Sequence, residues 1–166
     1  MAVSIPCSTL RATSKKLVER LCARGETLSS AESCTGGLIA KSVTDIPGSS
    51  AVFGGACVTY TNEIKTALLG VDPQIFERDT EVSFACAEAM AKGARERLGT
   101  TYALATTGYA GPGGGTDADP VGTVYLALAT PGGVKSERFS APAGANRTTV
   151  RKAATLRAFE MLEEIL

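Results

Sequence analysis

Three side chains that could perform chemistry, Ser50, Tyr60 and Lys65, lie close together in a chain of 166 residues that contains no histidine. Without an imidazole, the chain cannot form a Ser-His-Asp triad, a Cys-His pair or a histidine-ligated zinc site. A hydrolytic reaction would therefore need Lys, Tyr, Asp or Glu as its proton acceptor. A serine nucleophile paired with a lysine base is the natural candidate.

Lys65 must lose its proton before it can accept one from a serine hydroxyl. An unperturbed lysine has a pKa of about 10.4, and lowering that pKa to about 7.5 requires roughly 4 kcal/mol of destabilisation of the cation. Burial supplies much of this, and a nearby helix N-terminus also disfavours a cation. We expect Asn62 to cap a short helix, which would put Lys65 in its first turn.

The bulk composition favours one soluble domain over residues 1–166. Lys plus Arg and Asp plus Glu both number 17, so no basic excess predicts a nucleic-acid surface. No apolar stretch is long enough to cross a bilayer, and the N-terminus lacks the apolar core of a secretory signal. We expect a cytoplasmic protein with no nucleic-acid or membrane partner; the many small residues permit a homo-oligomer without indicating one.

The five cysteines show neither disulfide nor metal-site spacing. They form an odd set without a Cys-x-x-Cys pair, so we expect reduced, mostly packed thiols and no metal site. Cys34 is the rival nucleophile, because a strand is expected to become a helix there and a helix N-terminus lowers a thiol pKa. It ranks below the serine because the chain offers it no histidine partner.

Hydrophobic periodicity predicts helices that alternate with strands. Helices are expected over residues 8–24, from residues 32–37 to Pro47, and over 62–70, 84–98 and 148–166. Strands are expected over residues 27–31, 51–59, 102–106, 122–129 and 134–140, the last at a sheet edge because it is the most polar. This order predicts an α/β fold: a single-domain, three-layer α/β/α sandwich with a mixed sheet.

Four segments resemble the CinA C-terminal domain family: AESCTGG, PGSSAVFGGACVTYTNEIKTALLGV, GYAGPGGGTDADPVGTVYLALA and NRTTVRKAA. The resemblance covers nearly the whole chain, and the motifs occur in the family's order. It implies hydrolysis of the carboxamide of nicotinamide mononucleotide, giving nicotinate mononucleotide and ammonia, without a cofactor. Longer members carry an additional N-terminal domain similar to molybdopterin-binding proteins, which we do not expect within this sequence.

The resemblance also implies roles for individual residues. It places the nucleophile at Ser50, in a Gly-Ser-Ser turn, and completes the catalytic group with Lys65 and Tyr60. Tyr60 would either relay a proton between Ser50 and Lys65 or stack on the nicotinamide ring. By resemblance, Thr107 lines the active site at the entrance to the glycine-rich loop.

The phosphate of such a substrate has two candidate binding regions. The glycine-rich loop, which includes Gly108, Gly111 and Gly113, can present successive backbone amides to an anion. Arg147 and Arg151, at positions i and i+4, can present guanidinium groups from one face of the last helix. Further ligand contacts are expected from Ser33, Cys34 and Thr35, where a strand becomes a helix.

Two departures from the family pattern lie near these regions. Tyr109 stands where isoleucine is common in the glycine-rich loop, and Gly-Ala-Asn-Arg replaces the frequent Gly-Asp-Arg before the last helix. The second departure could change the orientation of Arg147. Neither departure touches the serine, tyrosine and lysine positions.

Other functions are also compatible with the sequence. One is a nucleotide-sensing or partner-binding module of the competence/damage-inducible type, which would keep the pocket without catalysis. Another is amide hydrolysis of a different pyridine or nucleoside substrate. Intact Ser50, Tyr60 and Lys65 favour an enzyme, whereas hydrolysis lost on chelation would indicate a metal held by carboxylates such as Asp45 and Glu63.

Overall fold

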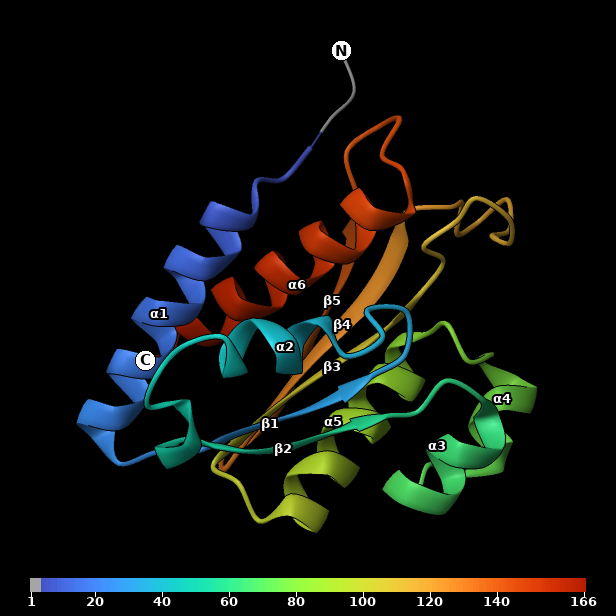
Figure 1. The fold of residues 1–166 in the computed structure, drawn as a ribbon. Helices are drawn as coiled ribbons and strands as arrows, with labels where there is room; N and C mark the ends of the chain where they lie inside the picture. The colour runs from blue at the N-terminus through green and yellow to red at the C-terminus, as the bar shows by residue number, and fades with distance from the viewer. Residues whose placement is uncertain (1–3) are drawn as a thin grey trace.

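The computed structural model describes residues 4–166 and places one five-stranded sheet between two layers of helices (Figure 1). The helices are α1 (Cys7–Arg24), α2 (Leu38–Thr44), α3 (Asn62–Leu69), α4 (Pro73–Arg78), α5 (Phe84–Leu98) and α6 (Arg147–Glu163), with a short 3₁₀ turn η1 (Ser49–Ala51). The strands are β1 (Leu28–Glu32), β2 (Phe53–Val58), β3 (Tyr102–Gly108), β4 (Thr123–Thr130) and β5 (Gly133–Ser140). The predicted three-layer α/β/α fold is confirmed.

Most expected elements are present with shifts of a few residues at their ends. The cap of α3 is Thr61, whose hydroxyl accepts a hydrogen bond from the amide of Ile64 at 3.4 Å. Asn62 is the first residue of that helix, so its predicted role as the cap is wrong. Helix α4 was not expected, because its six residues are too few to give a periodic pattern.

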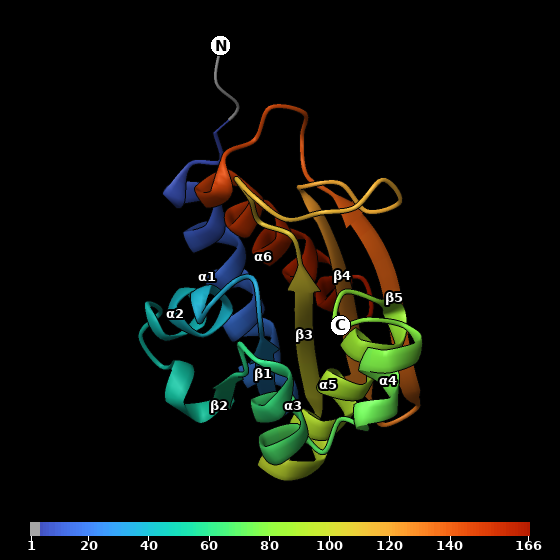
Figure 2. The same cartoon turned by 90° about the vertical axis from the view of Figure 1, so that its right-hand side faces the viewer.

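The order of the strands determines where loops meet. The sheet runs β2-β1-β3-β4-β5, with β2, β1 and β3 parallel and with β4 and β5 antiparallel to their neighbours. The sheet is therefore mixed, and β5 is an edge strand as predicted. In Figure 2, β3 runs up the centre of the view. Because β1, β2 and β3 point the same way, the loops that follow them meet at the carboxyl ends of these strands.

The two faces of the sheet pack differently. Along β4, Val124, Leu126 and Leu128 join the apolar cluster with α1, α2 and α6, whereas Ala127 and Ala129 face α5. The alanine face allows α5 to approach the sheet closely. Both views separate α1, α2 and α6 on one side of the sheet from α5 on the other. No helix within residues 4–166 combines the length and hydropathy needed to cross a membrane.

Close packing also fixes α3 against α5. A Cβ atom placed at Gly93 on α5 would lie 2.0 Å from the carbonyl oxygen of Leu69 on α3. Only glycine permits this approach, because real Cβ atoms do not come so near another heavy atom. Gly93 therefore sets the position of the helix that carries Lys65.

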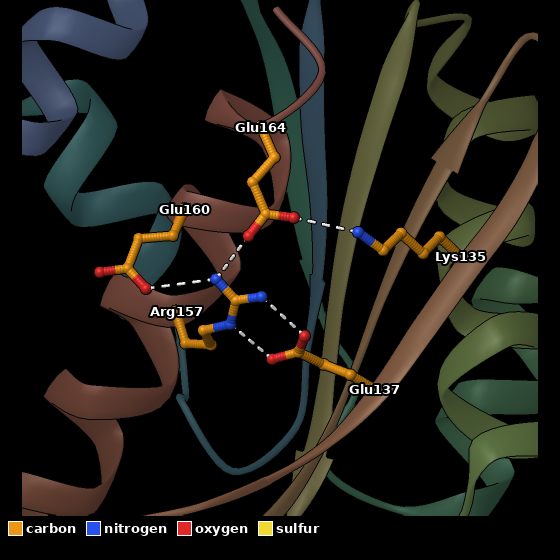
Figure 3. Close-up of polar contacts among 5 residues, drawn as sticks. All are labelled: Lys135, Glu137, Arg157, Glu160 and Glu164. Atoms are coloured by element: carbon orange, nitrogen blue, oxygen red, sulfur yellow. Dashed lines mark hydrogen bonds and ion pairs between the residues drawn. The ribbon is translucent and has the colours of Figure 1, made fainter.

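A charge cluster joins α6 to the edge strand β5 (Figure 3). The guanidinium group of Arg157 makes two hydrogen bonds to Glu137, at 2.6 and 2.8 Å, and a third to Glu164 at 2.8 Å. Lys135 donates to the other oxygen of Glu164 at 3.0 Å, and Glu160 lies 3.4 Å from Arg157. Hydrogen bonds to Glu137, Glu164 and Glu160, together with the negative charge of Glu137, raise the pKa of Arg157 above its ordinary value. The cluster anchors the far half of α6.

Candidate active site

A pocket of about 190 Å³ lies at the carboxyl ends of β1, β2 and β3. Six of the residues expected at the site line it: Ser33, Tyr60, Lys65, Thr107, Gly108 and Arg147. Three more, Cys34, Tyr109 and Ala110, belong to the two segments expected to face a ligand, whereas Glu81 and Val82 were not expected there. Crevices at this edge of a parallel sheet are common ligand sites in α/β proteins.

Lys65 is buried in this pocket and donates a hydrogen bond to a serine. Only 1% of Lys65 is exposed, and its Nζ atom donates to the carbonyl oxygen of Thr59 at 2.9 Å and to the Oγ atom of Ser33 at 3.3 Å. Burial lowers the pKa of Lys65, whereas Cys86 and, to a decreasing extent, Glu81, Cys34 and Glu63 raise it. A lowered pKa is what a lysine base requires.

Backbone hydrogen bonds hold the serine at the end of β1. The amide of Ser33 donates to the carbonyl oxygen of Thr106 on β3 at 2.9 Å, and its own carbonyl accepts from the amide of Gly36 at 3.1 Å. Ser33 is half-buried, so its hydroxyl can contact both Lys65 and a ligand. This pairing of serine and lysine was not expected from sequence, which treated Ser33 only as a ligand contact.

Two residues expected to bind substrate, Thr35 and Arg151, bind each other instead. Arg151 donates to the carbonyl oxygen of Thr35 at 3.0 and 2.6 Å, and neither residue lines the pocket. The Thr35 hydroxyl contacts the buried carboxylate of Glu32 at 2.7 Å, which also accepts from two backbone amides of α2. These contacts shape the loop that carries Ser33.

Arg147 joins the glycine-rich loop to Tyr60 beside the pocket. Its Nη1 atom donates to the carbonyl oxygen of Gly111 at 2.6 Å, and its Nη2 atom donates to the hydroxyl of Tyr60 at 2.8 Å. Tyr60 is 58% exposed and lies at the rim. Gly111 and Gly113 do not line the pocket, and Gly111 presents its carbonyl to Arg147, so a cradle of amides at these two glycines is not formed.

Ser50 and Lys65 lie at opposite ends of the strands. It belongs to η1, which precedes β2, whereas Tyr60 and Lys65 follow β2. A strand of six residues such as β2 spans roughly 17–20 Å. Within this chain, the predicted Ser50–Lys65 pair and the predicted relay through Tyr60 are therefore wrong: residues close in sequence are separated by the length of a strand.

Cys34 lacks the activation expected of it. The thiol is 5% exposed, and burial raises its pKa to about 12. The expected lowering by a helix N-terminus is not seen, and α2 begins only at Leu38, four residues further along the chain. A buried thiol with a raised pKa supplies little thiolate, so the structure does not support Cys34 as the nucleophile.

Glu81 is the charged lining residue that sequence reasoning missed. Its carbonyl oxygen accepts a hydrogen bond from the hydroxyl of Thr107 at 2.6 Å, which ties the segment before α5 to the end of β3. No motif marks Glu81; its position two residues before the helix cap Ser83 is the only signal. Within residues 4–166, no three His, Cys, Asp or Glu side chains are grouped so that they could hold a metal ion.

Comparisons with known proteins agree over nearly the whole chain. The model of a family described as "CinA C-terminal domain" matches residues 10–166. A CinA-like protein from Myxococcus xanthus is 52% identical over 151 residues, which cover 90% of this chain and 35% of the relative. Another, from Synechocystis sp., is 57% identical over 113 residues, 68% of this chain and 27% of the relative. The chain thus spans about a third of the length of these relatives.

Solved structures show the same fold. The competence/damage inducible protein CihA from Agrobacterium tumefaciens superposes with a TM-score of 0.91 and 38% identity, covering 99% of this chain and 98% of that one. A competence-damaged protein (CinA) superfamily protein from Escherichia coli gives a TM-score of 0.90 and 32% identity, covering 100% and 96%.

Proposed function

Because this chain belongs to the CinA C-terminal domain family, we propose that it hydrolyses the carboxamide of nicotinamide mononucleotide to nicotinate mononucleotide and ammonia. Ser33 is the proposed nucleophile and Lys65 the proposed base. The observation that supports this assignment is the 3.3 Å hydrogen bond between the two side chains inside the pocket. The resemblance of the four sequence motifs supports the choice of substrate.

The proposed reaction needs only groups that this chain supplies. Neutral Lys65 accepts the proton of the Ser33 hydroxyl while Oγ attacks the carboxamide carbon. The Lys65 ammonium then protonates the leaving nitrogen, the C–N bond breaks, and ammonia departs from an acyl-serine ester. Water attacks this ester and gives its proton to Lys65. The C–O bond to Ser33 breaks, and the proton returns to Oγ as the acid is released.

The pocket favours one orientation of the substrate. Its volume of about 190 Å³ lies below the roughly 300–1,000 Å³ of pockets that enclose a whole drug-sized ligand. We therefore place the amide ring inside, beside Ser33, and the phosphate near Arg147. Arg147 would exchange its bond to Gly111 or Tyr60 for the phosphate.

The second candidate function is a non-catalytic nucleotide-sensing or partner-binding module. The names of the solved relatives, which refer to competence and damage, favour it. A buried lysine weighs against it, because burial of an ionisable amine destabilises the fold and a sensor does not need a base. Calorimetric binding of the nucleotide without any product would support the sensor.

Ammonia release from nicotinamide mononucleotide by the purified chain, without added metal, tests the proposal. We expect turnover that a chelator does not reduce. Ser33→Ala should bind the nucleotide with similar affinity in a calorimetric titration and release no ammonia. Undiminished ammonia release by Ser33→Ala would contradict the assignment of the nucleophile, and no release by the wild-type chain would contradict the activity.

A further inference from the structure

Glu81 is an exposed residue of the pocket lining whose carboxylate has no partner among the described residues. Among residues 4–166, its side chain makes no hydrogen bond or ion pair, although it lines the same pocket as Lys65 and Arg147. Its charge raises the pKa of Lys65 and so opposes the burial that activates this base. The proposed hydrolysis does not use Glu81, and a carboxylate that works against the base calls for another role.

The backbone around Glu81 is held firmly. Thr107 binds its carbonyl oxygen, and the preceding residue, Thr80, has a φ of 67°, a conformation that side chains other than glycine rarely adopt. The Thr80 hydroxyl bonds to the amide and carbonyl of Val82 at 3.3 Å each, and Ser83 donates to the Thr80 carbonyl at 2.9 Å. This turn keeps Glu81 beside the pocket.

The lining of this pocket also includes an aromatic ring. Tyr109 is half-buried and lines the pocket together with Glu81. Burial, with added effects of Glu81 and Asp119, raises the pKa of Tyr109, so the phenol stays neutral. The face of a neutral aromatic ring attracts a cation, and a carboxylate nearby adds an opposite charge.

Charges of opposite sign lie on the lining of the pocket. The carboxylates of a second hollow beside Tyr109 are already occupied, because Asp79 and Asp119 pair with Arg78 and Arg138 and Glu88 accepts a hydrogen bond from Ser136, so the free negative charge is that of Glu81. Arg147 lies in the first pocket. A ligand with a positive ring and a negative phosphate would therefore meet opposite charge at both of its ends.

We propose that Glu81 and Tyr109 form a subsite that selects a cationic ring, so that the chain prefers pyridinium amides to uncharged amides of the same shape. This inference rests on the proposed function and adds a determinant of specificity to it. Binding of the cation has a second effect: it offsets the Glu81 charge that Lys65 experiences. The other ionisable groups that influence Lys65 are Cys86, Cys34 and Glu63. The cationic substrate thereby favours the neutral form of Lys65 that accepts the proton of Ser33.

The test compares nicotinamide mononucleotide with its reduced form, whose dihydropyridine ring carries no charge. We measure kcat/KM for ammonia release from both compounds and take the ratio, because a ratio compared between variants cancels their intrinsic reactivities. In Glu81→Gln the preference for the cation should fall roughly tenfold, equivalent to about 1.4 kcal/mol. Glu81→Asp should keep most of it, and Tyr109→Leu should lower it severalfold.

Glu63→Gln is the matched control, because Glu63 also influences Lys65 but lies outside the pocket. It should keep the wild-type preference. An unchanged preference in Glu81→Gln, or an equal loss in Glu63→Gln, would overturn the inference.

A wild-type chain that releases no ammonia would contradict the proposed function alone. The inference is then decided by calorimetric affinities for the two nucleotides, in the wild-type chain and in Glu81→Gln. Tighter binding of the cationic nucleotide that disappears in the variant would support it, and equal affinities in the wild-type chain would overturn it.

Discussion

The Nζ atom of Lys65 lies 3.3 Å from the Oγ atom of Ser33, although 32 residues separate the two in sequence. The contact exists because β1 and β2 are parallel and adjacent, so the residues that follow them reach the same edge of the sheet. It favours Ser33 over Ser50 as the proposed nucleophile.

Replacement of Ser33 by alanine should remove catalysis. We expect kcat to fall at least about 1,000-fold, because loss of a nucleophile removes covalent catalysis and leaves only binding effects. Steady-state ammonia release measures this, and the circular dichroism spectrum and melting temperature should match the wild-type chain. A fall in kcat of less than tenfold would exclude Ser33 as the nucleophile.

Ser50→Ala provides the comparison. Ser50 lies at the other end of β2 and is exposed, so this variant keeps the Ser33–Lys65 contact and should retain ammonia release. If turnover is instead lost, mixing Ser50→Ala with Ser33→Ala is informative. Recovered activity in the mixture would show that a second copy brings its Ser50 to the pocket.

The activity should increase with pH. Burial holds the pKa of Lys65 below its ordinary value of 10.5, and only the neutral amine can accept the serine proton. The kcat/KM should therefore rise with pH up to that lowered pKa and then level off. Lys65→Arg, whose guanidinium group stays protonated, should be inactive at every pH. Measurable activity in Lys65→Arg would contradict the role of Lys65 as the base.

Lysine burial also predicts how stability depends on pH. The folded chain binds fewer protons than the unfolded chain between the lowered pKa of Lys65 and its ordinary value, so the free energy of unfolding should rise with pH in this window. Lys65→Met should be more stable than the wild-type chain at neutral pH, and this advantage should shrink as the pH approaches 10.5. Urea unfolding at several pH values measures both effects.

Tyr60→Phe tests the contact between Tyr60 and Arg147. The hydroxyl accepts a hydrogen bond from Arg147 at 2.8 Å. If its role is to orient Arg147 for the phosphate, its loss should raise KM severalfold and leave kcat almost unchanged. A kcat lowered by about 100-fold with KM unchanged would instead indicate proton transfer through Tyr60.

Gly93→Ala should destabilise the fold strongly. A Cβ atom there would lie 2.0 Å from the Leu69 carbonyl oxygen, and overpacking of this kind costs about 3 kcal/mol. Gly113→Ala is the matched control, because a Cβ at Gly113 meets no atom within 4 Å; it should change the free energy of unfolding by less than about 0.5 kcal/mol. Equal stabilities of the two variants in urea unfolding would contradict the packing argument.

Arg157→Gln should lower the free energy of unfolding by about 1 kcal/mol at pH 7, because it removes the centre of a charge cluster. Hydrogen bonds from Arg157 and Lys135 hold the pKa of Glu164 below its ordinary value. The stability that this lowered pKa contributes is fully present above the pKa of Glu164 in the unfolded chain. It is lost as the pH falls through the lower pKa of Glu164 in the folded chain, so the difference in the free energy of unfolding between Arg157→Gln and the wild-type chain should shrink in acid. Arg78→Gln, at a more exposed pair, should have little effect.

The sequence predicted the fold better than the site because periodicity and helix ends are local signals. Gly25, Gly70 and Gly99 each end a helix with a positive φ, which only the adjacent residues need to specify. Six of the residues expected at the site also line the pocket, since each lies at or just beyond the end of a strand or in the first turn of a helix.

The error over Ser50 has a physical cause. Closeness in sequence does not imply closeness in space when a strand lies between two residues. Strand order brings Ser33 to Lys65, and the turn before α5 brings Glu81 to the pocket; no local pattern encodes the Ser33–Lys65 contact or the position of Glu81. Only the three-dimensional arrangement reveals that Ser33 contacts Lys65.

The small side chains between α5 and its neighbours have an evolutionary consequence. Gly93 and the alanines of β4 set how near α5 comes to α3 and to the sheet, and α3 carries Lys65. An enlarged side chain at these positions would shift the lysine away from Ser33 before it exposed any apolar surface. Selection for the proposed turnover would therefore constrain residue volume in this layer as well as at the pocket.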